Sequence, residues 1–203
     1  KVKIKWIDTE KLEVANNIDK YFEGVDGIII PGGFGDRGIE GKILSSKYAR
    51  EKKIPFLGIC LGMQCAVIDF ARNVCLLKNA NSKEFNSTAK YRVIDIMMNQ
   101  KNIENKGATM RLGSYACNIT NGTLAKKAYK KNNIYERHRH RYELNNKYIN
   151  KLKDNGLIIS GINLKLNLVE IIELQNHPWF VGVQFHPELK SRVLKPHPIF
   201  KNF

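Results

Sequence analysis

Cys60 follows an apolar run and directly precedes a predicted helix, in the pattern Gly58-Ile-Cys-Leu-Gly62. This G-x-C-x-G spacing is the thiol equivalent of the G-x-S-x-G elbow that presents a nucleophilic serine between a strand and a helix. Such a turn strains the backbone of the nucleophile and brings the residues two before and two after it close together, which favours glycine. The N-terminus of the following helix would lower the pKa of the thiol. For this stretch alone, a buried structural cysteine is an equal alternative.

A base for such a thiol stands near the end of the sequence, in Gln184-Phe-His-Pro-Glu188. His186 is expected at the end of a strand, and Pro187 is expected to keep the backbone extended. His186 and Glu188 would then project to one side. There the carboxylate can accept one imidazole N–H and leave the other ring nitrogen to deprotonate a thiol. The triplet alone is a weak signal, and it gains weight from the elbow at Cys60.

A glycine-rich segment, Pro31-Gly-Gly-Phe-Gly35, follows an apolar run over residues 25–30. Glycines at the end of a strand leave backbone N–H groups free to approach a ligand. The spacing matches neither the dinucleotide-binding G-x-G-x-x-G pattern nor a P-loop, and a tight turn is the alternative. This loop and the elbow both follow predicted strands, which is where open α/β sheets place their sites.

These loops require a scaffold, and 203 residues are enough for one α/β domain with a sizeable core. Strands are expected over 2–6, 25–30, 54–59, 93–98, 108–112, 115–119, 136–142, 157–162, 168–174 and 179–185. Helices are expected over 9–22, 39–53, 61–76, 123–129 and 145–155, and an exposed loop over 100–107. The predicted fold class is α/β, with an open, mainly parallel (flavodoxin-like) sheet flanked by helices and additional antiparallel strands.

The segment Glu136–Tyr142 alternates with period two, so a strand would place His138 and His140 on one face. The opposite face would carry the arginines, which are Arg137, Arg139 and Arg141. Two histidines could begin a metal site, but no third ligand is indicated nearby in the sequence. We therefore prefer hydrogen-bonded structural histidines and predict no metal.

Composition narrows the classes of partner. The formal net charge is +15, from 34 Lys and Arg against 19 Asp and Glu, but the lysines are scattered and not interleaved with aromatics. A solvated surface or complementarity to an acidic partner domain is preferred over nucleic-acid binding. No apolar run approaches the ~18 residues of a membrane span, and the first residues do not form a signal peptide. Four cysteines without metal-ligand spacing fit a reducing, cytoplasmic location.

Three motifs carry a family resemblance. Pro31–Gly35, Gly58–Gln64 and Phe185–Glu188 resemble the three signatures of class I (triad) glutamine amidotransferases. Further segments are similar to the glutaminase domain of CTP synthase, and these are 31–38 (PGGFGDRG), 79–85 (NANSKEF), 107–113 (GATMRLG), 136–143 (ERHRHRYE) and 176–180 (NHPWF). The resemblance runs over nearly the whole chain and implies the class I glutamine amidotransferase fold.

The resemblance also implies a domain organisation. Residues 1–203 would form the glutaminase domain, without the first strand and helix with which such domains usually begin, and with a shorter segment over 86–107. The synthetase domain that binds UTP and ATP is not expected within these residues.

By resemblance, the catalytic residues are Cys60 as nucleophile, His186 as general acid and base, and Glu188 as its orienting partner. The oxyanion would be held by the backbone N–H groups of Gly33 and Leu61. Glutamine would be bound by Gly33, Leu61, Gly62, Met63, Gln64, Glu84 and Arg141. Among these, Glu84 would take the α-ammonium group and Arg141 the α-carboxylate.

The same resemblance implies the chemistry and partners of a longer enzyme. This domain would hydrolyse L-glutamine without a cofactor, and the ammonia would serve the ATP- and Mg²⁺-dependent amination of UTP to CTP by a synthetase domain of the same polypeptide. GTP would act as an allosteric activator, and no residue is assigned to its site. The segment Phe34–Arg37 is a candidate lid only. The full enzyme would be a homo-oligomer, a tetramer, and no nucleic acid or membrane would be involved.

Two alternatives remain open at this point. The chain could be the glutaminase domain of another amidotransferase, such as one making GMP or carbamoyl phosphate, although ERHRHRYE and NANSKEF argue against it. It could also be a non-catalytic regulatory domain that retains the fold, although the three triad residues are all present.

Overall fold

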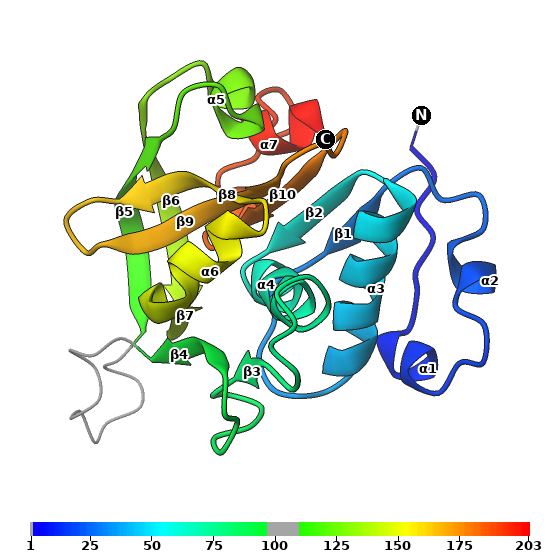
Figure 1. The fold of residues 1–203 in the computed structure, drawn as a ribbon. Coiled ribbons are helices and arrows are strands. Elements are labelled where there is room, and N and C mark those ends of the chain that lie inside the picture. The colour runs from blue at the N-terminus through cyan, green and yellow to red at the C-terminus, as the bar shows by residue number, and fades with distance from the viewer. Residues whose placement is uncertain (1, 97–109) are drawn as a thin grey trace.

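A seven-stranded mixed sheet forms the centre of the computed structural model, which describes residues 2–96 and 110–203 (Figure 1). In spatial order its strands are β1 (Ile28–Ile30), β2 (Phe56–Ile59), β10 (Phe180–Val183), β9 (Leu168–Leu174), β8 (Leu157–Asn163), β5 (Arg111–Ile119) and β6 (Asn133–His140). A smaller sheet contains β3 (Asn81–Ser82), β4 (Arg92–Ile96) and β7 (Tyr142–Leu144).

Parallel pairing is confined to three neighbouring strands. β2 pairs in parallel with both β1 and β10, whereas the pairs from β10 through β9, β8 and β5 to β6 are antiparallel. The residues of β2 and β10 are buried throughout, as expected for strands covered on both faces. The predicted α/β class is therefore confirmed, with the parallel part holding the two glycine-containing loops at its carboxyl edge.

Helices cover the parallel part of the sheet. The two longest are α3 (Ile39–Lys52) and α4 (Leu61–Asn73), which pack against each other and onto β1 and β2 (Figure 1). Under α4 the rings of Phe56 and Phe180 stack with centroids 4.4 Å apart, joining β2 to β10. The shorter helices are α1 (Thr9–Glu13), α2 (Asp19–Phe22), α5 (Leu124–Tyr129), α6 (Ile149–Asp154) and α7 (Pro198–Asn202), with 3₁₀ turns η3 (Asn146–Tyr148) and η4 (Pro187–Leu189).

The N-terminal predictions were wrong in two respects. The alternating residues Val2, Ile4 and Trp6 are exposed and form no strand among the described residues. Alternation alone is insufficient because a strand also needs a hydrogen-bonding neighbour. The single helix expected over 9–22 is two short helices, since Asn17 hydrogen-bonds the backbone N–H of Asp19 and interrupts the helical pattern.

Strand boundaries differ where the backbone turns. The two strands expected over 108–112 and 115–119 are one, β5, which begins at Arg111 within the described residues. The strand expected over 136–142 is divided between β6 and β7, which belong to different sheets, and Arg141 lies at the break. The parts of predictions that fall on residues 97–109 lie outside the described residues.

Candidate active site

Cys60 occupies a strained turn between β2 and α4. Its backbone angles are φ 51° and ψ −100°, in a region that residues with a side chain rarely adopt. A Cβ on Gly58 would lie 2.7 Å from the carbonyl group of Gly62, and a Cβ on Gly62 would lie 2.2 Å from the carbonyl oxygen of Ile30. The packing thus supplies the steric reason for glycine that the sequence pattern suggested.

His186 and Glu188 form a close pair at the end of β10. His186 Nδ1 lies 2.6 Å from Glu188 Oε1, and although burial opposes it, this hydrogen bond lowers the pKa of the Glu188 carboxyl. The other ring nitrogen, Nε2, is buried and has no hydrogen-bond partner among the described residues. Contrary to expectation, Pro187 does not keep the chain extended. It begins the 3₁₀ turn η4, which brings Glu188 back onto the imidazole.

The loop 31–35 lies against both the nucleophile and the imidazole. A Cβ on Gly32 would lie 2.7 Å from His186 Cε1 and 3.6 Å from Cys60 Cβ. A Cβ on Gly33 would lie 3.1 Å from a side-chain methyl of Leu61. The structure therefore brings Gly33 and Leu61 together, as a shared oxyanion site would require. It adds Gly32, a close contact of the site that the sequence interpretation did not single out although it stands in the same Pro-Gly-Gly run.

The Cys60 thiol is not activated in the way the elbow suggested. Burial raises its pKa to about 12, the backbone N–H of Leu61 lowers it only in part, and the nearby carboxylates of Glu143, Glu188 and Glu84 raise it further. The expected lowering by the helix N-terminus is therefore outweighed by desolvation. At neutral pH the sulfur is a protonated thiol and needs a base to become a nucleophile.

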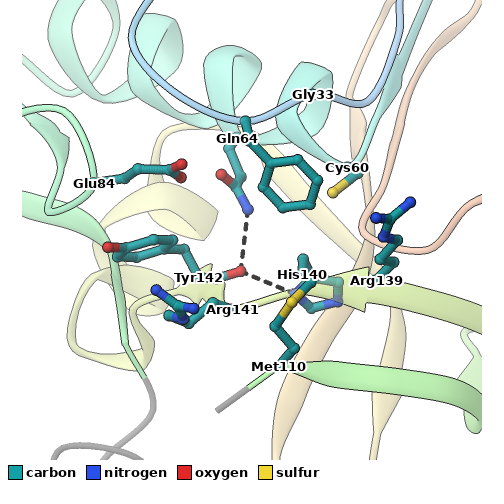
Figure 2. Close-up of a pocket in the computed structure, with 10 residues that line it drawn as sticks. Gly33, Cys60, Gln64, Glu84, Met110, Arg139, His140, Arg141 and Tyr142 are labelled. Atoms are coloured by element: carbon teal, nitrogen blue, oxygen red, sulfur yellow. Dashed lines mark hydrogen bonds between the residues drawn. The ribbon is translucent and has the colours of Figure 1, made fainter. Parts of the chain in front are cut away.

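A pocket of about 370 Å³ opens beside Cys60 (Figure 2). Its lining residues are Gly33, Phe34, Cys60, Gln64, Glu84, Met110, Arg139, His140, Arg141 and Tyr142. Leu61, Gly62 and Met63, which were also expected at the substrate, do not line it among the described residues. Gly62 packs on Ile30, and Met63 is fully buried in the core.

Opposite charges lie at the end of the pocket away from Cys60 (Figure 2). Glu84, which follows β3, accepts a hydrogen bond of 3.1 Å from the backbone N–H of Gly35. Burial raises the pKa of Glu84, and the Gly35 N–H and Arg141 partly offset the rise. Arg141 reaches this position because it lies at the break between β6 and β7. A pocket with a thiol at one end and a carboxylate and a guanidinium, those of Glu84 and Arg141, at the other suits an amino acid with a side-chain carbonyl.

His138 and His140 are hydrogen-bonded, as the preferred interpretation expected. Their rings are joined by a 2.8 Å contact between His138 Nδ1 and His140 Nε2, and His140 Nδ1 contacts the carbonyl oxygen of Tyr142 at 3.1 Å. Burial lowers the pKa of both imidazoles, that of His140 to about 3. Within residues 2–96 and 110–203, no group of three or more His, Cys, Asp or Glu is arranged to hold a metal ion.

The family of this fold is decided by comparison with known proteins. The class-I glutamine amidotransferase family matches residues 1–203. The chain belongs to this family. It is 57% identical over 202 residues to CTP synthase of Clostridium kluyveri and 54% identical over 202 residues to CTP synthase of Bacillus subtilis. Both matches cover 100% of this chain, but only 37% and 38% of those proteins.

A solved structure gives the same relationship for the domain alone. The glutaminase domain of Trypanosoma brucei CTPS, with bound acivicin, is 40% identical with a TM-score of 0.91. The match covers 98% of this chain and 78% of that one, so this amidotransferase chain shares the fold of that glutaminase domain and is similar to it in sequence. Within the described residues, no helix is long and apolar enough to cross a membrane.

Proposed function

We propose that this chain hydrolyses L-glutamine to glutamate and ammonia as the glutaminase domain of a CTP synthase. The observation that carries the proposal is the pairing of His186 with Glu188 next to a strained Cys60 elbow, with the loop 31–35 packed on both. The kinship to CTP synthases supports the choice of substrate.

In the proposed reaction, His186 Nε2 takes the proton from the Cys60 thiol, and the sulfur attacks the amide carbon of glutamine. The tetrahedral intermediate collapses as His186 returns that proton to the departing nitrogen, which leaves as ammonia. Water, deprotonated by His186, then attacks the thioester and releases glutamate and the thiol. Glu188 holds the imidazole in the tautomer that leaves Nε2 able to accept a proton.

The negative charge that develops on the amide oxygen would be held by the backbone N–H groups of Gly33 and Leu61. Their two loops are in contact in this structure. Removing one donor of this kind typically costs about 3 kcal/mol of transition-state stabilisation.

At the far end of the pocket, Arg141 would bind the α-carboxylate and Glu84 the α-ammonium group. An incoming ammonium stabilises the Glu84 carboxylate and opposes the rise in its pKa caused by burial. Gln64 lines the pocket between the two ends.

The remaining proposals concern a longer protein, since the chain spans 37% of the Clostridium kluyveri CTP synthase. There the ammonia would aminate UTP in a synthetase domain that uses ATP and Mg²⁺, with GTP as activator and a cytoplasmic tetramer as the assembly. The name CTP synthase and the greater length of the relatives support a further domain in such a protein.

A glutamine-analogue diazoketone should label Cys60, and mass spectrometry at pH 7–8 should find a single adduct on its peptide. Cys60→Ala should abolish both labelling and glutamine-dependent CTP formation by the full-length enzyme, while amination with added ammonium salt persists. Cys75→Ala is the matched control, because this other buried free thiol lies outside the pocket. An unlabelled Cys60, or undiminished glutamine hydrolysis by Cys60→Ala, would refute the proposed function.

A further inference from the structure

Gln184 is a fully buried side chain that the mechanism above does not use. The sheet fixes its backbone, because Cys60 N–H donates to the carbonyl of Val183 at 2.7 Å and Gln184 N–H donates to the carbonyl of Glu170 at 2.9 Å. Its side-chain Nε2 donates a hydrogen bond to Cys60 Sγ over 3.6 Å. Strand register thus places a glutamine amide directly on the nucleophile.

The orientation of this amide is set by a chain of hydrogen bonds that begins at a backbone carbonyl. The Tyr142 carbonyl oxygen can only accept, so the group 3.1 Å away must be Nε2 of Gln64 (Figure 2). The same Nε2 donates to Oε1 of Gln184 at 3.3 Å. With its oxygen facing Gln64, Gln184 must turn its N–H group toward Cys60.

We propose that Gln184 is a hydrogen-bond donor to the nucleophile, one that stabilises the Cys60 thiolate over the thiol and holds the sulfur toward the pocket. A donor to the charged form of a group favours that form. Because a neutral amide does not titrate, it can do so without competing with His186 for the proton. As a contribution to catalysis, this role rests on the proposed glutaminase function.

The other groups around the sulfur show why such a donor is needed. Burial and three carboxylates favour the thiol, and these carboxylates come from β7, η4 and the segment after β3: Glu143, Glu188 and Glu84. The backbone N–H of Leu61 favours the thiolate. Among the described residues, the other ionisable groups here are the imidazole packed on Gly32 and the remaining pocket side chains, which are His186, His140, Arg139, Arg141 and Tyr142. Gln184 supplies a second N–H donor to the sulfur.

The test is the pH dependence of Cys60 alkylation by iodoacetamide, followed on its own peptide by mass spectrometry. Gln184→Met keeps the length of the side chain and removes the donor. We expect its alkylation rate at pH 8 to fall about tenfold and its profile to move about one pH unit higher, since one pKa unit changes the thiolate fraction tenfold. For glutamine hydrolysis, kcat should fall by a similar factor, with a smaller change in KM.

Gln175→Met is the matched control, because this glutamine is exposed at the end of β9 and should leave the profile unchanged. If circular dichroism shows that Gln184→Met does not fold, Gln64→Leu tests the same chain of hydrogen bonds without changing the segment that follows β10. It should shift the profile in the same direction, because Gln184 loses the partner that fixes its orientation.

The role of Gln184 is overturned if Gln184→Met folds and its alkylation rate depends on pH as in the wild type. If Gln184→Met does not fold, the same result for a folded Gln64→Leu overturns it. If the wild-type protein still hydrolyses glutamine, the proposed function stands in that case. Conversely, a shifted profile in a protein that never hydrolyses glutamine would support the donor and refute the glutaminase. The two proposals can therefore fail separately.

Discussion

Gly62 shows how tightly the turn around the nucleophile is packed. A Cβ at this position would lie 2.2 Å from the Ile30 carbonyl oxygen and 2.9 Å from the Ile30 Cβ, both on the neighbouring strand β1. Backbone cannot move aside as a flexible side chain can. Accommodating even one methyl group therefore requires α4 and β1 to separate, and the loop that follows β1 carries Gly32 and Gly33.

We predict that Gly62→Ala destabilises the protein by about 3 kcal/mol, at the upper end of the usual cost of overpacking. Glutamine hydrolysis should fall with it, because the shift moves the loop 31–35 relative to Cys60. Urea unfolding and steady-state kinetics measure the two effects. Gly113→Ala is the control, since a Cβ there meets no atom within 4 Å. Its cost comes only from placing an alanine backbone at a φ of +95°. Equal losses in the two variants would contradict the packing argument.

The sequence predicted residues of the site where the chemistry is local and missed those that depend on register. Cys60 and its glycines, and the pairing of His186 with Glu188, follow from spacings of a few residues. Gln184 lies 124 residues after Cys60 in the chain, and it touches the sulfur only because β10 pairs with β2. No local pattern encodes that neighbour, although Gln184 stands two residues before His186.

At the scale of elements, a buried cluster of charges joins the two sheets. Arg111 on β5 donates to Glu143 on β7 at 2.9 Å and to Glu170 on β9 at 2.7 Å. Burial raises the pKa of Glu143 to about 8 and that of Glu170 to about 7, with Arg111 opposing the rise. Burial also keeps the adjacent His138 and His140 neutral. Two carboxylates share one guanidinium, so a proton held by the pair near neutral pH offsets the excess negative charge.

The two carboxyls of this cluster contribute stability that falls as pH rises from about 5 to about 8. His138 and His140 contribute in the opposite direction below about pH 7, because they stay neutral in the folded state and bind protons once unfolded, so the carboxyl contribution is measured as the difference between the wild type and a carboxyl variant. Carboxyls in the unfolded chain titrate near 4.3, whereas the folded pair keeps a proton to higher pH, so the folded state binds more protons in this window. The raised pKa therefore stabilises the fold at low pH, and that contribution is lost as pH rises through the folded values. Urea unfolding between pH 5.5 and 8 measures it.

Glu143→Gln should flatten this pH dependence, because the amide mimics the protonated acid at every pH. We expect the loss of stability across the window to shrink by roughly 1 kcal/mol or more, since one pKa unit corresponds to about 1.4 kcal/mol. Glu51→Gln is the control, because this carboxylate is exposed at the end of α3. A wild-type slope in Glu143→Gln would show that the pair does not hold the proton.

The elements themselves were predicted best where they are long and buried. The strands β8 and β9 and the helix α4 lie close to their expected ranges, because their apolar runs are also their cores. The helix α3 also lies close to its range, although it is mostly polar and buries only one side. The failed strand over 2–6 has the right alternation but no neighbour among the described strands. The division between β6 and β7 depends on tertiary structure. The polar and apolar residues keep alternating through this segment, so the sequence pattern does not mark the residue at which the chain leaves one sheet for the other.

For the whole molecule, the arrangement of strands decides where the ends of the pocket lie. The parallel strands β1, β2 and β10 bring the nucleophile, the glycine loop and the base to one edge. The smaller sheet brings Tyr142 and the neighbouring Arg141 to the other side of the same pocket. The sequence indicated the nucleophile, the glycine loop, the base and Arg141 but not Tyr142, and the mixed strand order that brings them together is a property of the assembled sheets.

Without a synthetase domain, this chain should be a slow glutaminase. Burial leaves the Cys60 thiol with a pKa of about 12, and the described residues place three carboxylates but few donors toward it. We therefore predict that the 203-residue chain alone hydrolyses glutamine slowly, and that a CTP synthase synthetase domain added with ATP, UTP and GTP accelerates it. Coupling between sites is typically worth about 1–3 kcal/mol, so the acceleration should be roughly 5- to 150-fold. Glutamate release by the chain, with and without that domain, measures it, and Cys60→Ala gives the background. A chain that is equally fast alone would show that its own residues complete the site.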